Sequence, residues 1–257
     1  MRTDAMVVHH SIAAWQEARR GADFAGSRIG FVPTMGALHA GHRALLDRAW
    51  TENDRVVLSI FVNPTQFNDP ADLQKYPRPL EADLALAGEF ATDVIVPAAG
   101  ELYPDDYCFR VTEHGLTGEL EGAHRPGHFD GVLTVVLKLL NLVQPHRSYF
   151  GEKDWQQLQL VRGMARTFFL PGEIVACPTV REDDGVALSS RNARLSAAGR
   201  ARARMFPKIL RESPDARVAA AALRETGFQV DYVEDRAGRR LGAVRVENVR
   251  LIDNVPL

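Results

Sequence analysis

The sequence predicts an α/β protein, in which helices cover both faces of a parallel sheet and a small α+β domain follows. Two observations lead to this fold class. Up to Pro178, short and continuously apolar segments alternate with segments of helical composition, as expected for strands buried on both faces of a sheet. After Pro178, a charged turn at 181–185 is followed by helical segments rich in Ala and Arg, and then by further apolar segments. We therefore expect two domains, residues 1–178 and 179–257.

The elements of the first domain are predicted in order from their periodicity, composition and stop signals. Ser11 is a suitable N-cap for the first helix, and prolines end several of the strands. The expected segments are a helix at 12–20, a strand at 28–32, a helix from about 41, a strand at 56–62, a helix at 80–90, a strand at 94–96, a helix at 131–143, a strand at 148–150, a helix at 155–168 and a strand at 174–177.

In the second domain, we expect helices at 196–210 and 216–226. Strands are expected at 230–233 and 244–249, and both could pair with a segment at 249–252.

The composition is that of an ordinary globular protein, with 46% hydrophobic and 25% charged residues among 257. A net charge of −2 gives no basic field that would attract nucleic acid. Cys108 and Cys177 are too few for a disulfide framework, and residues 1–10 lack the long apolar core of a signal peptide. The longest apolar segment, 132–143, is too short to span a bilayer. We therefore expect a cytoplasmic protein that binds neither membrane nor nucleic acid.

The segment at 31–42, F-V-P-T-M-G-A-L-H-A-G-H, carries the clearest chemical signal. It connects an apolar strand to a helix, and His39 and His42 share one face if this stretch is helical. Free N–H groups at a helix N-terminus favour a phosphate, and imidazoles there can donate hydrogen bonds to its oxygens. The segment therefore indicates nucleotide chemistry.

Two simpler interpretations of this segment stay open: a pair of surface histidines, or half of a metal site. The sequence contains no H-E-x-x-H and only two cysteines, which argues against the metal site. It also lacks the G-x-x-x-x-G-K-[ST] phosphate loop.

Two further clusters offer neutral and charged hydrogen-bonding groups in expected loops. Asn63 and Gln66 follow a strand and could bind a small polar ligand, although Asn-Pro is also a common turn. Arg125 and His128 precede the long apolar helix, and a plain loop is an equally good interpretation of them.

Two more clusters are suited to phosphate. Lys153, in F-G-E-K-D, supplies a compact positive charge, and Asp154 could orient it or bind sugar hydroxyls. Ser189, Ser190 and Arg191 could bind a triphosphate. In both places the alternative is a helix-capping cluster.

The order of these motifs resembles that of a known family. Along the chain we find P-T-M-G-A-L-H-A-G-H, S-I-F-V-N-P-T-Q-F, Y-P-R-P-L-E-A-D, R-P-G-H-F, F-G-E-K-D-W-Q-Q-L, A-L-S-S-R-N, D-Y-V-E and R-L-I-D-N. This set resembles the pantoate–β-alanine ligases (pantothenate synthetases) over nearly the whole chain. Segment 39–42 also resembles the H-I-G-H motif of class I aminoacyl-tRNA synthetases and nucleotidylyltransferases.

The resemblance implies a Rossmann-like nucleotidyltransferase domain with a parallel sheet, plus a small C-terminal domain that acts as a lid. It implies that ATP activates pantoate as pantoyl adenylate, which β-alanine then attacks to give pantothenate and AMP. It further implies Mg²⁺ as a cofactor and a homodimer.

The resemblance also implies roles for individual residues. His42 matches the family's proposed proton donor, and His39, Lys153 and Arg191 complete the catalytic set. ATP binding is assigned to Met35, Gly36, Ala37, Leu38, His39, Ala40, Gly41, His42, Gly151, Glu152, Lys153, Asp154, Val180, Leu188, Ser189, Ser190 and Arg191. Pantoate and β-alanine binding is assigned to Pro33, Thr34, Met35, Asn63, Gln66, Arg125, His128 and Gln157, with both glutamines expected to be buried.

Some positions depart from the family pattern. Asp83 matches an acidic position near magnesium, but Ala82 replaces its acidic neighbour. Asp130 stands where many members have a basic or small residue. The C-terminal domain is expected to be shorter than in typical members.

Two rival functions share this fold. A different adenylate-forming or nucleotidylyl-transferring enzyme would retain the histidines without the pantoate-binding amides. A non-catalytic nucleotide-binding relative would be expected to lack one of the four catalytic residues, and all four are present.

Overall fold

The computed structural model describes residues 5–257, so the first four residues of the N-terminal stretch considered above lie outside it. The chain forms two compact units. The first contains residues 5–38, His42–Phe150 and Gln156–Cys177; the second contains His39–Gly41, Gly151–Trp155 and Pro178–Leu257.

A six-stranded parallel sheet forms the centre of the first unit, as the sequence predicts. Its strands are β1 (Val7–His9), β2 (Ile29–Thr34), β3 (Arg55–Ile60), β4 (Asp93–Ile95), β5 (Arg147–Gly151) and β6 (Glu173–Cys177). Their order is β1-β4-β3-β2-β5-β6, and Ile29 of β2 pairs with Arg55 of β3. The loops that follow β2, β3 and β5 therefore leave the sheet at the same edge.

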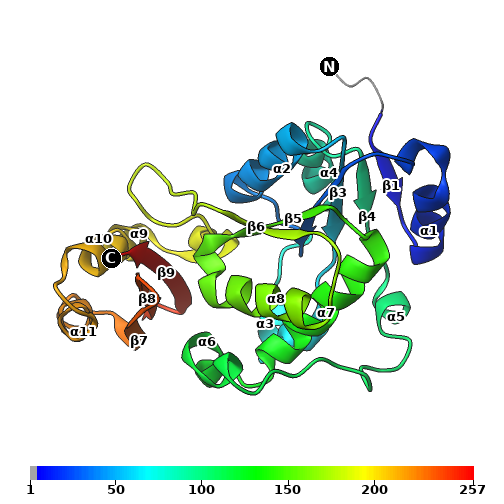
Figure 1. Ribbon diagram of the computed structural model, residues 1–257. Helices are drawn as coiled ribbons and strands as arrows, with labels where there is room; N and C mark the ends of the chain where they lie inside the picture. Colours follow the sequence, from blue (N-terminus) through cyan, green and yellow to red (C-terminus); the bar gives the residue numbers. More distant parts are fainter. Residues whose placement is uncertain (1–4) are drawn as a thin grey trace. The chain divides into compact units, whose positions relative to one another are not determined.

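Helices cover both faces of this sheet (Figure 1). The unit contains α1 (Ile12–Arg20), α2 (Ala40–Glu52), α3 (Pro70–Gln74), α4 (Leu80–Ala87), α5 (Ala99–Leu102), α6 (Leu120–His124), α7 (His128–Val143) and α8 (Trp155–Thr167). One apolar cluster joins Trp15 of α1 to α7 and α8, and a second joins α2 and α4 to the opposite face. The continuous apolar strands are thus buried on both sides.

Most predicted elements of the first unit are confirmed, including the Ser11 N-cap, whose hydroxyl accepts a hydrogen bond from Ala14 N. The sequence prediction missed β1, a three-residue edge strand. His9 anchors this strand, because its Nε2 lies 3.0 Å from the buried carboxylate of Asp93 on β4. The helix expected from Gly131 begins three residues earlier, at His128.

The second unit packs three helices against a three-stranded antiparallel sheet of order β7-β8-β9. Its elements are α9 (Ala197–Ala203), α10 (Met205–Glu212), α11 (Ala216–Glu225), β7 (Gln229–Arg236), β8 (Arg239–Val246) and β9 (Val249–Pro256). The expected small α+β arrangement is therefore present.

Two boundaries predicted for this unit were wrong. The single helix expected at 196–210 is two helices, which separate at Arg204. The strand expected at 244–249 crosses a turn between β8 and β9, where Glu247 adopts a left-handed φ of 54°. Val244 and Val249 are both buried, so the apolar pattern conceals the turn between them.

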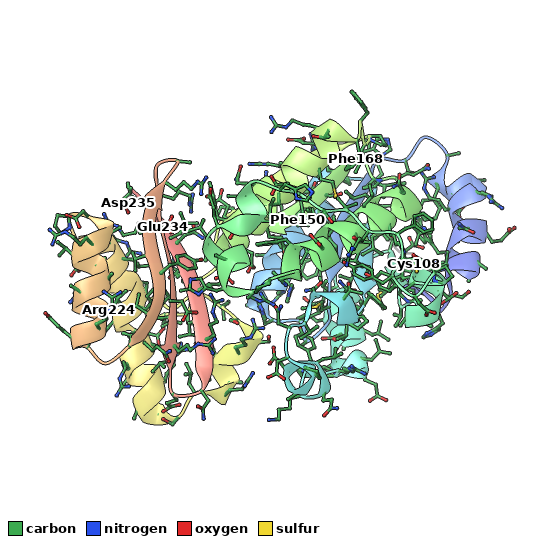
Figure 2. The ribbon with its side chains drawn as sticks, turned by 90° about the horizontal axis from the view of Figure 1, so that it is seen from below. Cys108, Phe150, Phe168, Arg224, Glu234 and Asp235 are labelled. Carbon is green, nitrogen blue, oxygen red and sulfur yellow. The ribbon has the colours of Figure 1, made fainter. Side chains whose placement is uncertain are left out.

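A buried arginine joins the sheet to α10. Arg240, only 1% exposed, donates through Nε and Nη2 to the two carboxylate oxygens of Asp235, which lies near the end of β7 (Figure 2). It also donates to the carbonyls of Leu210 and Ser213 at the end of α10. Its guanidinium lowers the pKa of the Asp235 carboxyl through these hydrogen bonds.

Two further expectations concern cysteines and membranes. Cys108 and Cys177 are both free thiols. Within residues 5–257, no helix combines the length and apolar character needed to cross a bilayer.

Candidate active site

The loop between β2 and α2 is fixed by a buried carboxylate on α4. Asp83, 2% exposed, accepts hydrogen bonds from Ala37 N at 2.9 Å and Leu38 N at 2.7 Å. Gly36 has a φ of 78°, and a Cβ there would lie 2.8 Å from Asp83 Oδ2. Thr34 Oγ1 accepts from Gly36 N and donates to the carbonyl of Ser59 on β3. These hydrogen bonds therefore fix the backbone conformation of segment 34–38.

The expected contact of Asp83 with magnesium stays a prediction. Each of its oxygens already accepts a backbone hydrogen bond from the loop. Among residues 5–257, no group of three or more His, Cys, Asp or Glu side chains is placed to bind a metal. In the structure, Asp83 fixes the loop through its two hydrogen bonds.

A cavity of about 410 Å³ lies in the first unit beside this loop. Its lining is mostly apolar, and Arg78 and Asp83 are its charged residues. Its walls are Met35, Ile60, Phe61, Val62, Pro64, Leu73, Arg78, Leu80, Asp83, Val96, Pro97 and Ala99.

Gln66 lies on a short 3-10 helix, Pro64–Gln66, directly after β3. Its Nε2 donates to Met35 Sδ at 3.2 Å, and its Oε1 accepts from Asn63 Nδ2 at 2.9 Å. The side chain is half-buried, and one N–H and one oxygen lone pair remain for a ligand. Met35 and Gln66, predicted from separate motifs, are therefore brought together.

Asn63 holds the side chain of Gln66 in place through the hydrogen bond from its Nδ2. It is 1% exposed, and its Nδ2 also donates to Gly131 O, while its Oδ1 accepts from Tyr103 Oη and Thr65 Oγ1. All hydrogen-bonding positions of the amide are thus occupied by protein groups. The expected substrate contact of Asn63 is not confirmed, because this geometry makes it a support for the glutamine.

Arg125 and His128 contact the same 3-10 helix. His128 Nδ1 lies 2.8 Å from the carbonyl of Gln66, and its Nε2 lies 3.1 Å from Arg125 Nη1. Because the carbonyl only accepts and the guanidinium only donates, a neutral ring protonated on Nδ1 satisfies both contacts. The R-P-G-H motif therefore fixes the backbone of Gln66.

The two adjacent glutamines of W-Q-Q-L have different environments. Gln156 is buried and donates to the carbonyls of Leu116 and Glu119, whereas Gln157 is only partly buried. The expected burial of Gln66 and Gln157 was wrong, since both are partly exposed. Their amides are accessible to a ligand, and Gln156, which the motif analysis passed over, is the structural residue.

In the second unit, His39 precedes α2 and is a neutral hydrogen-bond donor. Its Nδ1 accepts from Gly41 N at 3.1 Å, which leaves the proton on Nε2. Burial lowers the pKa of His39, and the positive charge of Lys153 lowers it further. A Cβ at position 41 would lie 2.8 Å from the ring, so this geometry requires glycine.

Lys153 lies in the same unit, on the 3-10 turn Glu152–Asp154 that follows β5. Its side chain is 19% exposed, and its ammonium nitrogen lies 3.7 Å from the Asp154 carboxylate. Asp154 ends this turn, and α8 begins at the next residue, Trp155.

The loop at 188–191 is also part of the second unit. Ser189 caps the short helix Ser190–Arg194 by accepting from Arg191 N, so the capping alternative describes this hydroxyl correctly. Leu188 N donates to Val180 O, and the Cβ of Leu188 lies near Gly41. The second unit thus brings together segments 39–41, 152–154 and 180–191.

The sequence matches one protein family over nearly its whole length. A family model described as pantoate-beta-alanine ligase matches residues 7–256. The chain is 53% identical to a pantothenate synthetase of Bdellovibrio bacteriovorus over 95% of both chains, and 46% identical to one of Legionella pneumophila, covering 97% of this chain and 99% of that one.

The solved structures that resemble this chain include proteins with the same names as these relatives. A pantoate-beta-alanine ligase from Francisella tularensis, complexed with beta-gamma ATP and beta-alanine, has a TM-score of 0.93, 39% identity and 98% coverage of both chains. A pantothenate synthetase from Thermus thermophilus has a TM-score of 0.88 and 43% identity, over 98% of this chain and 99% of that one.

Proposed function

The chain belongs to the pantoate–β-alanine ligase family, and from this membership we propose how its own side chains carry out the family's reaction. The enzyme uses ATP to join pantoate and β-alanine through a pantoyl adenylate, and it releases AMP and pyrophosphate.

One observation carries the assignment of the phosphate site. Within the second unit, His39 is kept neutral by burial and by the charge of Lys153. A polyphosphate needs hydrogen-bond donors and positive charge, which the His39 N–H and the Lys153 ammonium supply. Both groups can bind the phosphate oxygens without first changing their protonation state. We assign ATP to His39, Lys153, Val180, Leu188 and Arg191, together with the backbone of the loop at 35–38.

In the first step, a pantoate carboxylate oxygen attacks the α-phosphorus, and the bond to the pyrophosphate oxygen breaks. Both reactants are anions, so negative charge accumulates at the phosphorus. Lys153 and Arg191 stabilise this charge, and His39 donates through Nε2. His42 supplies a proton to the leaving pyrophosphate.

Gln66 and Gln157 bind the hydroxyls of pantoate. Neutral amides suit this task because a hydroxyl both donates and accepts. Gln66 retains one donor and one acceptor after its contacts to Met35 and Asn63. A site with such groups discriminates against analogues that lack the hydroxyls, because its polar groups are then left without partners.

In the second step, the β-alanine amine attacks the acyl carbon and expels AMP. The adenylate is open to hydrolysis, so exclusion of water is required. We propose that residues 179–257 act as the lid, and that Mg²⁺ enters as part of the ATP substrate without an Asp83 ligand.

Two further parts of the proposal rest on family resemblance, namely a cytoplasmic location and a homodimer. Light scattering at micromolar concentration should give twice the chain mass of 28.4 kDa. A single-chain mass would reject the dimer.

The experiment that tests the function measures pyrophosphate and AMP with ATP, magnesium and pantoate, and then with β-alanine added. Sustained AMP and pantothenate formation only with both substrates is expected. Equal turnover with a different carboxylic acid or with a mononucleotide would replace the substrate assignment.

A further inference from the structure

We propose that Asp253 and Asn254, two consecutive residues of β9, position the two turns that carry Lys153 and Arg191. The proposal rests on the assignment of these two residues to ATP given above. Both Asp253 and Asn254 belong to the R-L-I-D-N motif, and all of the contacts described below lie within the second unit.

The burial of these side chains requires an explanation. Asp253 is 4% exposed and Asn254 is 2% exposed, in a strand whose other buried positions are apolar. A buried polar group is costly unless its hydrogen bonds are made. Consecutive strand residues point in opposite directions, so the two can serve different segments.

Asn254 binds the turn of Lys153. Its Nδ2 donates to the carbonyl of Glu152 at 2.9 Å and to that of Lys153 at 3.0 Å, which uses both of its N–H groups. Its Oδ1 accepts from Arg239 Nε at 2.6 Å, and Arg239 also lies 3.4 Å from the Glu152 carboxylate. The course of the turn on both sides of the Lys153 Cα is therefore fixed from β9.

Asp253 binds the segment that leads to Arg191. Its two oxygens accept from Arg181 Nη1 at 2.7 Å and from Nη2 at 2.9 Å. Arg181 in turn donates to Gly185 O and forms a backbone bridge with Ala187, immediately before Leu188–Arg191. A bidentate pair of this kind fixes orientation as well as distance.

Positioning matters here because a lysine ammonium is a point charge on a flexible stem. Its distance from the phosphorus depends on where its Cα is fixed, and a misplacement of about 1 Å can reduce the rate about 100-fold. Neither Asp253 nor Asn254 needs to touch ATP to have this effect. We regard them as positioning residues.

The test uses Asn254→Asp, which keeps the size of the side chain but places an acceptor against two carbonyls. Asn248→Asp is the matched control, because it makes the same chemical change at an exposed position in the turn before β9. We expect Asn254→Asp to lower kcat/KM for ATP by about 10- to 100-fold and to change KM for pantoate less than twofold. Asn248→Asp should match wild type in both.

A double-mutant cycle separates positioning from general damage. If Asn254 acts through Lys153, Asn254→Asp should have almost no further effect in a Lys153→Ala background. The proposal would be overturned if Asn254→Asp lowered kcat/KM for ATP by the same factor in the wild-type and the Lys153→Ala backgrounds. It would also be overturned if Asn254→Asp weakened pantoate binding as much as it lowered kcat/KM for ATP. If Asn254→Asp does not fold, Asn254→Ser takes its place in the cycle.

The outcomes also distinguish the positioning role of Asn254 from the assignment of Lys153 to ATP, on which it rests. Wild-type turnover of Lys153→Ala would reject the phosphate role of Lys153. An impaired Lys153→Ala enzyme together with a fully active Asn254→Asp enzyme would reject the positioning role alone.

Discussion

The carboxylate of Asp83 allows a quantitative prediction. In Asp83→Asn, one loop N–H keeps an acceptor oxygen, whereas the other faces an amide N–H₂. One charge-assisted hydrogen bond is lost, and one partly buried N–H is left without an acceptor. Hydrogen bonds to charged groups contribute about 1.5–3 kcal/mol, and an unsatisfied buried donor costs about 1–3 kcal/mol. We expect the unfolding free energy of the first unit to fall by about 2.5–6 kcal/mol, which is the sum of these two contributions.

The assay is calorimetric unfolding of the two proteins. With roughly 2–4 °C per kcal/mol for a domain of this size, the transition of the first unit should move down by roughly 5–24 °C. Glu81→Gln is the control, since Glu81 is exposed on the same helix, and its unfolding should change by less than about 0.5 kcal/mol. An Asp83→Asn protein that unfolds within a degree of wild type would refute the reasoning.

Magnesium dependence gives an independent check of the same residue. If Asp83 fixes the loop, the Mg²⁺ concentration for half-maximal activity should be unchanged in Asp83→Asn even where turnover falls. A metal ligand would behave differently, and its loss should raise that concentration by at least about tenfold.

Three other predictions concern the proposed site. Lys153→Ala should lower turnover by about 10²–10³ while circular dichroism stays unchanged; wild-type turnover would remove Lys153 from the phosphate site. Gln157→Ala should raise KM for pantoate more than KM for ATP, and equal increases would reject its assignment. Because the folded pKa of His39 lies below its unfolded value of 6.5, the unfolded state binds a proton first as pH falls through 6.5, so stability should fall there. His39→Gln should weaken this loss in denaturant titrations between pH 7 and 5, and an unchanged slope would contradict the cause given for the shift.

The strands and long helices of the first unit could be predicted because their signal is local. Continuous apolar strands such as β3 are buried on both faces, and their sequence alone indicates this. The edge strand β1 could not be predicted in the same way, since it depends on the contact of His9 with Asp93, 84 residues away. The break between α9 and α10 at Arg204 was missed because the local sequence keeps a helical composition across it.

In the candidate site, too, some residues could be predicted from local motifs, whereas the roles of others depend on distant contacts. Residue types at Lys153, Gln66 and His39 suggested chemistry from the motifs alone. Which of Gln156 and Gln157 is buried could not be inferred, because the answer depends on the carbonyls of 116 and 119. The roles of Asp83 and Asn63 were hidden similarly, since an acidic or amide side chain suggests a ligand contact until its protein partners are known.

The hydrogen bonds from Asn254 also bear on the order in which the enzyme matures. The Lys153 turn and its partner are separated by 101 residues, so a ribosome finishes the whole first unit well before it makes Asn254. A nascent chain can therefore fold the segment of Gln66, to which we assign pantoate, while its lysine turn still lacks these bonds. Catalytic competence should thus arise late in synthesis, when β9 pairs with β8, and not when the parallel sheet closes.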